Sequence, residues 1–296
     1  MTAKTPAQED VDRLISLMDM EEVSQDRFLA QSDNIGTLAV FGGQVLGQAL
    51  SAASRTMTPD RQAHSLHAYF LLPGEHAPVT YEVDRVRDGR SFSTRRVRAL
   101  QGDKTIFELM ASFQTADEGV DHQATMPDVP GPEGLADESA ALQGIRQILP
   151  PYFQDKSLAP RGLEFRRVAP LDLLNPAPRT GGSCVWVRAK APLPDDPALH
   201  RALLAYGSDH GFITVANEPH GLTLFRGNLR MASLDHTMWF HRDFRLDQWL
   251  LYQIESPSAS GARGLCLGRF YTQDGQLVAS VAQEGMIRLQ SRKPAG

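Results

Sequence analysis

The sequence is short of several kinds of residue, and each shortage argues against a class of protein. Its 296 residues include two cysteines, Cys184 and Cys266, which supply neither a disulfide framework nor a metal-ligand pattern and fit a reducing compartment. No run approaches the roughly 18 apolar residues that span a membrane. The net charge is −5 and no basic tract is present, which argues against nucleic-acid binding. We therefore expect a cytoplasmic protein without membrane or nucleic-acid partners.

Targeting and nucleotide-binding motifs are missing as well. The first residues, MTAKTPAQEDVDRL, are polar and lack the apolar core of a secretory signal, and the terminal SRKPAG differs from a peroxisomal Ser-Lys-Leu address. The stretch YGSDHG has the wrong order for the G-x-S-x-G nucleophile elbow, so an α/β-hydrolase is excluded. No G-x-G-x-x-G or Walker pattern follows an expected strand, which argues against nucleotide or dinucleotide use.

Proline, glycine and aspartate are concentrated in the middle of the chain, in TMPDVPGPEG and ILPPYFQDKSLAPRG. Such segments propagate neither a helix nor a central strand. A short helix is expected between them, over residues 137–148, because DESAALQGIRQI begins with acidic residues and has apolar spacing. We predict three parts: an N-terminal unit over 8–116, a linker over 117–161, and a C-terminal unit over 162–291.

The two predicted units have the same order of elements. The first opens with helical segments over 11–18 and 25–29, continues with a buried helix within 37–57, and ends in the β-rich runs SLHAYFLL, VTYEVDRVR, SFSTRRVRAL and TIFELMASFQ. The second opens with the strands LEFRRV and SCVWVRAKA. It continues with a helix over 197–213 and ends in LDHTMWFH, WLLYQIESP, ARGLCLGRFY and LVASVAQEGMIRL.

Spacing supports a duplication. Ser65 and Gln114 are 49 positions apart, and Ser233 and Gln283 are 50 apart. This leaves a one-residue ambiguity in the register of Gln114 against Gln283, which matters because one residue moves a side chain to the opposite face of a strand. A long helix without a strongly polar face needs cover on several sides, and a curved antiparallel sheet supplies it. The expected fold is α+β, a double hotdog of two tandem units, each a long helix wrapped by a curved antiparallel sheet, with the two sheets joined edge to edge.

The motifs themselves resemble those of the acyl-CoA thioesterase II family. The similarity lies in FGGQVLGQAL, HSLHAYFLLPG, DGRSFSTRRV and ASFQ in the first half, and in LDHTMWFHR, DGQLVAS and QEGMIR in the second. Together they extend over roughly 14–288 and weaken only in the linker. The resemblance implies a double-hotdog enzyme that hydrolyses acyl-CoA to free fatty acid and CoA without a metal or an organic cofactor. By analogy with hotdog proteins, it also implies a homodimer or a homotetramer.

The resemblance also implies the site residues. The family places an aspartate, a threonine or serine, and a glutamine around the attacking water, and these positions correspond to Asp209, Ser233 and Gln283. Serine replaces the threonine of many relatives, and it keeps the hydroxyl but lacks the stiffening methyl. At the border of the apolar stripe of the 197–213 helix, the Asp209 carboxylate would be partly desolvated and so a stronger base.

The oxyanion donors are expected at the start of a hotdog helix, where free N–H groups favour negative charge. Gly42 and Gly43 are the candidates, because a residue without Cβ lets a thioester approach the backbone. Between Asn34 and Pro59 there is no aspartate or glutamate, so the first half has no counterpart of Asp209. We predict one site per chain.

The sequence also allows other roles for its histidines and other functions for the chain. His64, His67, His236 and His241 lie on expected strands without an accompanying ligand set, so structural roles are expected rather than metal binding. Asp235 and His236 would face opposite ways on a strand. The alternative functions are a non-catalytic acyl-CoA-binding hotdog protein and another hotdog enzyme, such as an enoyl-CoA hydratase.

Overall fold

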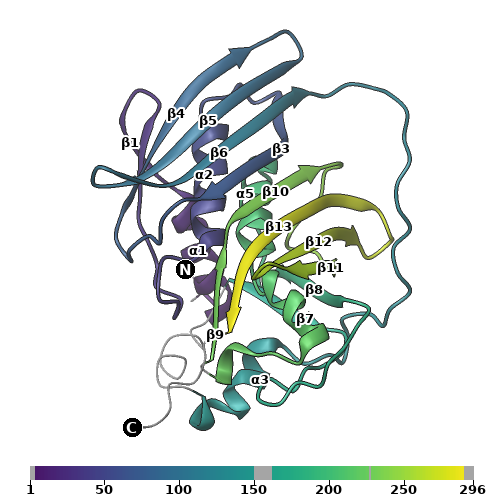
Figure 1. The fold of residues 1–296 in the computed structure, drawn as a ribbon. Coiled ribbons are helices and arrows are strands. Elements are labelled where there is room, and N and C mark those ends of the chain that lie inside the picture. Colours follow the sequence, from purple (N-terminus) through teal and green to yellow (C-terminus); the bar gives the residue numbers. More distant parts are fainter. Residues whose placement is uncertain (1–3, 150–161, 227, 290–296) are drawn as a thin grey trace.

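The computed structural model describes residues 4–149, 162–226 and 228–289 (Figure 1). The first half contains α1 (Pro6–Met18), β1 (Glu21–Ser24), β2 (Arg27–Ala30), α2 (Gly42–Arg55), β3 (Arg61–Phe70), β4 (Val79–Asp88), β5 (Phe92–Gln101) and β6 (Lys104–Thr115). The short helix α3 (Glu138–Gly144) and the 3₁₀ turn η1 (Arg146–Ile148) follow. The second half contains β7 (Leu163–Arg167), β8 (Ser183–Ala189), α5 (Pro197–Ser208), η2 (Ile213–His220), η3 (Leu224–Arg226), β9 (Leu229–Ser233), β10 (Asp235–Phe240), β11 (Leu250–Ser260), β12 (Arg263–Thr272) and β13 (Leu277–Leu289).

In the described residues the strands form one antiparallel sheet whose order repeats on the two sides of its centre. The order is β1-β2-β4-β5-β6-β3-β10-β13-β12-β11-β8-β7, with β9 paired to β13. At the centre β3 and β10 join the two halves edge to edge, with Leu66 opposite Met238. Pairing these strands removes two open edges, as expected for the duplicated fold. The part boundaries at 116/117 and 161/162 stay predictions, and residues 150–161 and 290–291 lie outside the described ranges.

The helices α2 and α5 pack against each other, and the sheet curves around the pair (Figure 1). They run antiparallel, since Gly43 of α2 faces the carbonyl of Tyr206 and Gly47 faces the carbonyl of Ala202. A Cβ at Gly43 would lie 2.3 Å from the Tyr206 oxygen, so the two backbones are closer than any larger side chain permits. One buried apolar cluster continues from the first half into the second through this contact.

The segment between β6 and α3 covers the outer face of the second half. It runs beside β12 and β13 in Figure 1, and Gln123 exchanges hydrogen bonds with the backbone of Gly275 and Leu277. Trp186 donates from Nε1 to the Pro130 carbonyl at 2.9 Å. A second, smaller apolar cluster forms here, comprising Trp186, Trp249, Leu251, Tyr271 and Leu277, with Met126, Val129 and Leu135 packed on it. Among the described residues, no helix is both long and apolar enough to cross a membrane.

Two expected helices differ in the structure. Residues 25–29 were expected to be helical, but Arg27–Ala30 is strand β2, paired with β1 and β4. Asp26 has a φ of 57° and makes the β1–β2 turn, while Phe28 and Ala30 alternate inward as a strand requires. The helix expected over 197–213 ends at Ser208. Its extension stops because Gly211 turns the chain with a φ of 69°, and Ile213 starts η2 instead.

The close helix contact gives a stability prediction. A Cβ at Gly47 would lie 2.8 Å from the Ala202 carbonyl oxygen, which is backbone and has little freedom to move. Overpacking of this kind costs about 1–3 kcal/mol, which exceeds or offsets the gain of about 1 kcal/mol in helix propensity from glycine to alanine. We expect G47A to lower the free energy of unfolding in urea titrations. The matched control is G119A, whose Cβ would meet no atom within 4 Å. An equal stability change in both variants would contradict the prediction.

Candidate active site

Asp209, Ser233 and Gln283 lie in mutual contact, although they are far apart in the sequence. Gln283 Nε2 donates to Asp209 Oδ1 at 3.0 Å and to Ser233 Oγ at 2.6 Å. Ser233 Oγ donates to Asp209 Oδ1 at 3.4 Å. The three residues come from the C-cap of α5, the end of β9 and the middle of β13. The fold therefore converts three distant segments into one polar cluster.

Asp209 has an unusual electrostatic position. It is the C-cap of α5, so its charge lies at the helix end that disfavours anions. Burial raises the pKa of this carboxyl from 3.8 to about 6, although hydrogen bonds from Gln283, the Gly43 backbone and Ser233 work in the opposite direction. The expected increase in basicity is present. The pKa is raised because the carboxyl is buried at the packed end of α5. Asp209 follows this helix and therefore does not lie on its apolar stripe.

The start of α2 completes the surroundings of this carboxylate. Gly42 and Gly43 are the first two residues of α2, whose N–H groups have no partner within the helix turn. The backbone N–H of Gly43 bonds the Asp209 carboxylate. A Cβ at Gly42 would lie 2.7 Å from Asp209 Oδ2 and 3.0 Å from the Phe70 ring. Both glycines thus border the acidic group.

Gln283 points toward the helices from the inner face of the sheet and has no exposed surface. In the first half the inward position is occupied by Phe113, which is fully buried, whereas Gln114 next to it is partly exposed. Gln114 therefore lies on the opposite face of its strand from Gln283, and the inward positions near it, Ala111 and Phe113, are apolar. The first half has no amide at this place.

His236 is a neighbour whose contact with the cluster the sequence did not reveal. The ring is fully buried, and its Nδ1 lies 2.8 Å from Gln283 Oε1. Asp235 faces the other way and accepts from the Glu284 backbone, so the two residues do not form a pair, as expected. His236 belongs to the motif LDHTMWFHR, but its contact with Gln283 depends on the inward direction of its ring, which the motif does not give.

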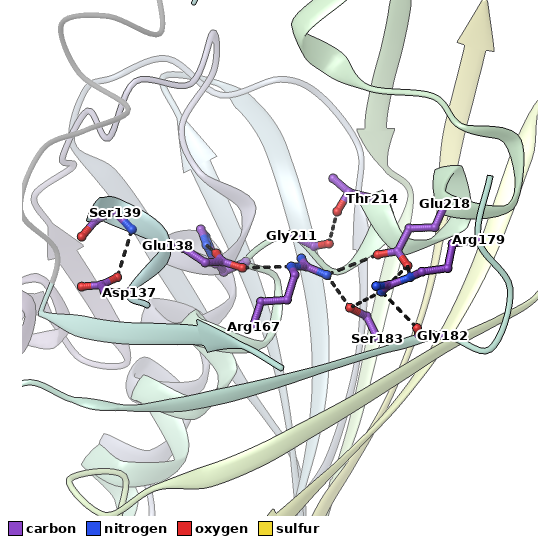
Figure 2. A network of polar contacts seen from close by, with 11 residues as sticks. Asp137, Glu138, Ser139, Arg167, Arg179, Gly182, Ser183, Gly211, Thr214 and Glu218 are labelled. Atoms are coloured by element: carbon purple, nitrogen blue, oxygen red, sulfur yellow. Dashed lines mark hydrogen bonds and ion pairs between the residues drawn. The ribbon is translucent and has the colours of Figure 1, made fainter. Parts of the chain in front are cut away.

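A network of charges holds the linker helix α3 beside this site (Figure 2). Glu138 of α3 lies 3.2 Å from Nε2 of His210, the residue after Asp209, and 3.3 Å from Nε of Arg167. Burial by itself raises the pKa of Glu138, but the hydrogen bonds and charges of His210 and Arg167 outweigh it and lower the pKa to about 2. On the other side of Arg167, Glu218 also binds Arg179 at 2.9 Å.

The other candidate histidines have single polar contacts at separate places on the sheet. His64 Nε2 lies 2.8 Å from Ser112 Oγ, and His241 Nε2 lies 2.9 Å from Ser280 Oγ. His67 stacks edge-on against Trp239. The described residues contain no group of three or more histidine, cysteine, aspartate or glutamate side chains arranged to hold a metal ion.

Comparison with protein-family models matches each half separately. Residues 30–114 match the acyl-CoA thioesterase N-terminal domain, and residues 178–286 match the acyl-CoA thioesterase family. Together the two matches include every residue of the candidate site, with Gly42 and Gly43 in the first and Asp209, Ser233 and Gln283 in the second.

Whole-chain comparisons agree. The acyl-CoA thioesterase 2 of Haemophilus influenzae is 40% identical over 279 residues, covering 94% of this chain and 98% of its own. The human acyl-coenzyme A thioesterase 8 is 39% identical over 291 residues, covering 93% and 88%. Among solved structures, the acyl-CoA thioesterase II TesB2 from Mycobacterium marinum is 41% identical with a TM-score of 0.77, covering 94% of this chain and 99% of that one.

A more distant structure confirms the fold alone. A protein described as having a hot dog fold, from Alicyclobacillus acidocaldarius, is 20% identical with a TM-score of 0.75, covering 94% of this chain and 99% of that one. Two helices wrapped by two joined antiparallel sheets, with the polar cluster where the helix ends meet, define a double-hotdog protein. With relatives about 40% identical over almost its whole length, the chain belongs to the acyl-CoA thioesterase family.

The position of Gly42 gives an activity prediction. In G42A the new Cβ would displace the Asp209 carboxylate and press on the Phe70 ring, both of which are side chains that can move. In G43A it would meet the Tyr206 backbone oxygen, which cannot move alone. We expect G42A to lower kcat on the order of a hundredfold with a small change in stability, and G43A to lower stability itself. Steady-state kinetics and urea titrations of both variants check this; full activity of G42A would contradict it.

The raised pKa of Asp209 gives a stability prediction with a defined sign. Between pH 3.8 and about 6 the folded chain binds this proton more tightly than the unfolded chain, so stability falls as the pH rises through this window. We expect D209N, which lacks the charge and keeps Oδ1 as an acceptor, to be more stable above pH 6 by on the order of 3 kcal/mol. The advantage shrinks toward pH 4. Unfolding titrations at both pH values measure it, with the exposed D103N as control; a pH-independent difference would count against the raised pKa.

Proposed function

We propose that this chain hydrolyses the thioester bond of acyl-CoA, giving free fatty acid and CoA by direct attack of a water molecule. The observation that carries the proposal is the contact of Asp209, Ser233 and Gln283 beside the start of α2. Their polar atoms are separated by 2.6–3.4 Å, so a water molecule that binds Asp209 and Ser233 lies beside Gln283 as well. Membership of the acyl-CoA thioesterase family supports the substrate.

In this mechanism Asp209 is the general base. With a pKa of about 6, the carboxylate is mainly ionised near pH 7 and is close to the pH at which a base is most effective. Gln283 holds Asp209 and Ser233 in place, and these two hold the water so that its lone pair points at the thioester carbon. The water oxygen attacks this carbon as Asp209 takes the proton. The C–S bond of the tetrahedral intermediate then breaks, and the CoA sulfur leaves with that proton.

The negative charge on the carbonyl oxygen requires a donor. Gly42 and Gly43 supply backbone N–H groups at the positive end of the α2 dipole. The Gly43 N–H already bonds Asp209, so we assign the oxyanion to Gly42 N–H, with Gly43 holding the base in place. A thioester carbonyl can approach this turn because neither residue has a Cβ.

A water nucleophile fits better than a cysteine nucleophile. Cys266 lies opposite Gln283 in the sheet and is fully buried. Burial raises the pKa of its thiol to about 12, so the thiol stays protonated and is a poor nucleophile. Burial also raises the pKa of Cys184. The proposal therefore includes no acyl-enzyme.

We further propose one such site per chain. The C-cap of α2 is Thr56, where α5 has Asp209. The guanidinium of the buried Arg95 donates to Thr56 Oγ1 at 2.8 Å and to Asp88 at 2.8 Å. With Thr56 at the end of α2 and the apolar Ala111 and Phe113 at inward positions of β6, the described residues of the first half lack counterparts of Asp209 and Gln283. The first half serves as structural partner and as a wall of the acyl pocket.

The assembly and the location are also part of the proposal. The exposed faces of β3, β6 and β10 carry Tyr69, Met110 and Trp239, which are 62%, 40% and 38% exposed. Apolar groups gathered on one face suit contact between copies, which supports a homodimer or homotetramer. The two cysteines are free, which supports a cytoplasmic enzyme of fatty acid metabolism.

Thiol release from a panel of acyl-CoA chain lengths tests the function. We expect free CoA from the parent chain, and kcat/KM that falls as the pH is lowered through about 6, because protonated Asp209 no longer accepts the proton of water. D209N should lose at least a hundredfold in kcat while remaining folded, since a general base contributes 10²–10⁴-fold as an order of magnitude.

The alternatives give different results in the same assay. A non-catalytic acyl-CoA-binding protein would bind the substrates without releasing thiol. An enoyl-CoA hydratase would change the absorbance of an enoyl-CoA without releasing thiol. Absence of thiol from every chain length, or a D209N variant as active as its parent, would refute the proposal.

A further inference from the structure

His236 connects the end of α5 with Gln283. It lies on β10 with its ring fully buried between the sheet and the helices. One ring nitrogen, Nδ1, is 2.8 Å from Gln283 Oε1, and the other, Nε2, is 2.9 Å from Ser208 Oγ. Ser208 is the last residue of α5, directly before Asp209. The contacts therefore connect Ser208 through His236 and Gln283 to Asp209, so they begin and end at the C-terminal end of α5.

The contacts of Gln283 determine where the hydrogen between its amide and His236 lies. Gln283 Nε2 has two hydrogens, and these point to Asp209 Oδ1 and Ser233 Oγ. Gln283 Oε1 therefore accepts, so the hydrogen between the ring and the amide belongs to His236 Nδ1. A neutral ring protonated at Nδ1 has a lone pair on Nε2, which faces the Ser208 hydroxyl at 2.9 Å. The single hydrogen of this hydroxyl also has the Ala205 carbonyl as an acceptor at 2.8 Å. Burial lowers the pKa of His236 to about 4, which keeps the ring neutral near pH 7.

The opposite orientation of the Gln283 amide would be unfavourable. A flipped amide would place Oε1 3.0 Å from Asp209 Oδ1, so that two acceptors would face each other. The flip would also point the amide N–H groups at the N–H of the His236 ring. Nothing in the Gln283 side chain itself prevents this rotation, because an amide has similar shape in both orientations.

We propose that His236 is a positioning residue, whose Nδ1–H fixes the Gln283 amide with Nε2 toward Asp209 and Ser233. This inference rests on the proposed hydrolysis at Asp209, Ser233 and Gln283. His236 contacts neither the water nor the thioester in this role. It acts on the rate by keeping the groups that hold the water in one arrangement.

Three substitutions distinguish this role from packing. In asparagine the amide nitrogen is separated from Cα by as many bonds as Nδ1 of histidine, and in glutamine by as many as Nε2. H236N therefore keeps a donor toward Gln283 Oε1, whereas H236Q and H236L do not. We expect kcat to fall on the order of a hundredfold in H236L and H236Q, to recover by at least tenfold in H236N, and KM to change little in all three.

A double-mutant cycle connects the effect with Gln283. If His236 acts through the amide, H236L should lower kcat much less in the Q283A background than in the parent chain. Equal losses of kcat in both backgrounds, or H236N no better than H236Q, would overturn the proposal. Urea titrations of each variant separate a change in rate from a loss of fold.

The tautomer can be measured in the parent chain without any activity. Nitrogen-15 NMR of histidine-labelled protein distinguishes Nδ1–H, Nε2–H and doubly protonated rings, and H236N assigns the signal. We expect a neutral Nδ1–H ring between pH 5.5 and 8. A ring protonated at Nε2 would overturn the proposal even if hydrolysis is confirmed. Absence of hydrolysis, with the tautomer as expected, would instead refute the proposed function.

Discussion

The contact between α2 and α5 is the constraint on which the rest of the structure depends. Gly43 and Gly47 let the helix backbones approach to a distance that excludes a Cβ, so the positive end of α2 lies beside the negative end of α5. A carboxylate at the end of α5 is then disfavoured by its own helix and by burial, and favoured by the N–H groups of α2. Its pKa of about 6 is the balance between burial, which raises it, and the hydrogen bonds of Gln283, the Gly43 backbone and Ser233, which lower it. A base suited to neutral pH therefore follows from how closely two helices pack.

The two halves use the same architecture for different purposes. At the end of α2 the buried Arg95 donates to Thr56 and to backbone carbonyls, which is a favourable place for a cation. At the end of α5 the buried charge is negative and costs stability. A buried negative charge that lowers stability at the end of α5, together with a favourably placed cation at the end of α2, is typical of a functional site in an otherwise stable fold. The two halves therefore differ in the electrostatics of their helix ends as well as in their side chains.

Much of the fold was predictable because its signals are periodic and local. Alternating runs predicted the long strands, and repeated spacing predicted the tandem order. The strand Arg27–Ala30 was missed because four residues are too few to show a period, and its conformation depends on the turn at Asp26 and on pairing with β4. The end of α5 was missed because the apolar spacing continues to Ile213, while the chain turns at Gly211.

The candidate site was predictable only in part. Asp209, Ser233 and Gln283 were found because the motifs around them resemble a family, and composition alone would not have selected them. The inward direction of Gln283, and the outward direction of Gln114 in the first half, depend on a one-residue register that only the strand pairing determines. The link from His236 to Gln283 joins residues 47 positions apart and needs the inward face of two strands.

The linker that wraps the outer face of β8, β11 and β12 has a consequence for symmetry. A duplicated sheet would present two similar outer faces, and two similar faces on one chain allow head-to-tail growth without an end. Here the apolar side chains of one face, including Trp186 and Tyr271, are covered by the chain's own Met126 and Val129. Within the described residues, Tyr69 and Trp239 stay exposed, so the two outer faces differ. The connection between the halves thus removes the equivalence of faces that head-to-tail growth needs.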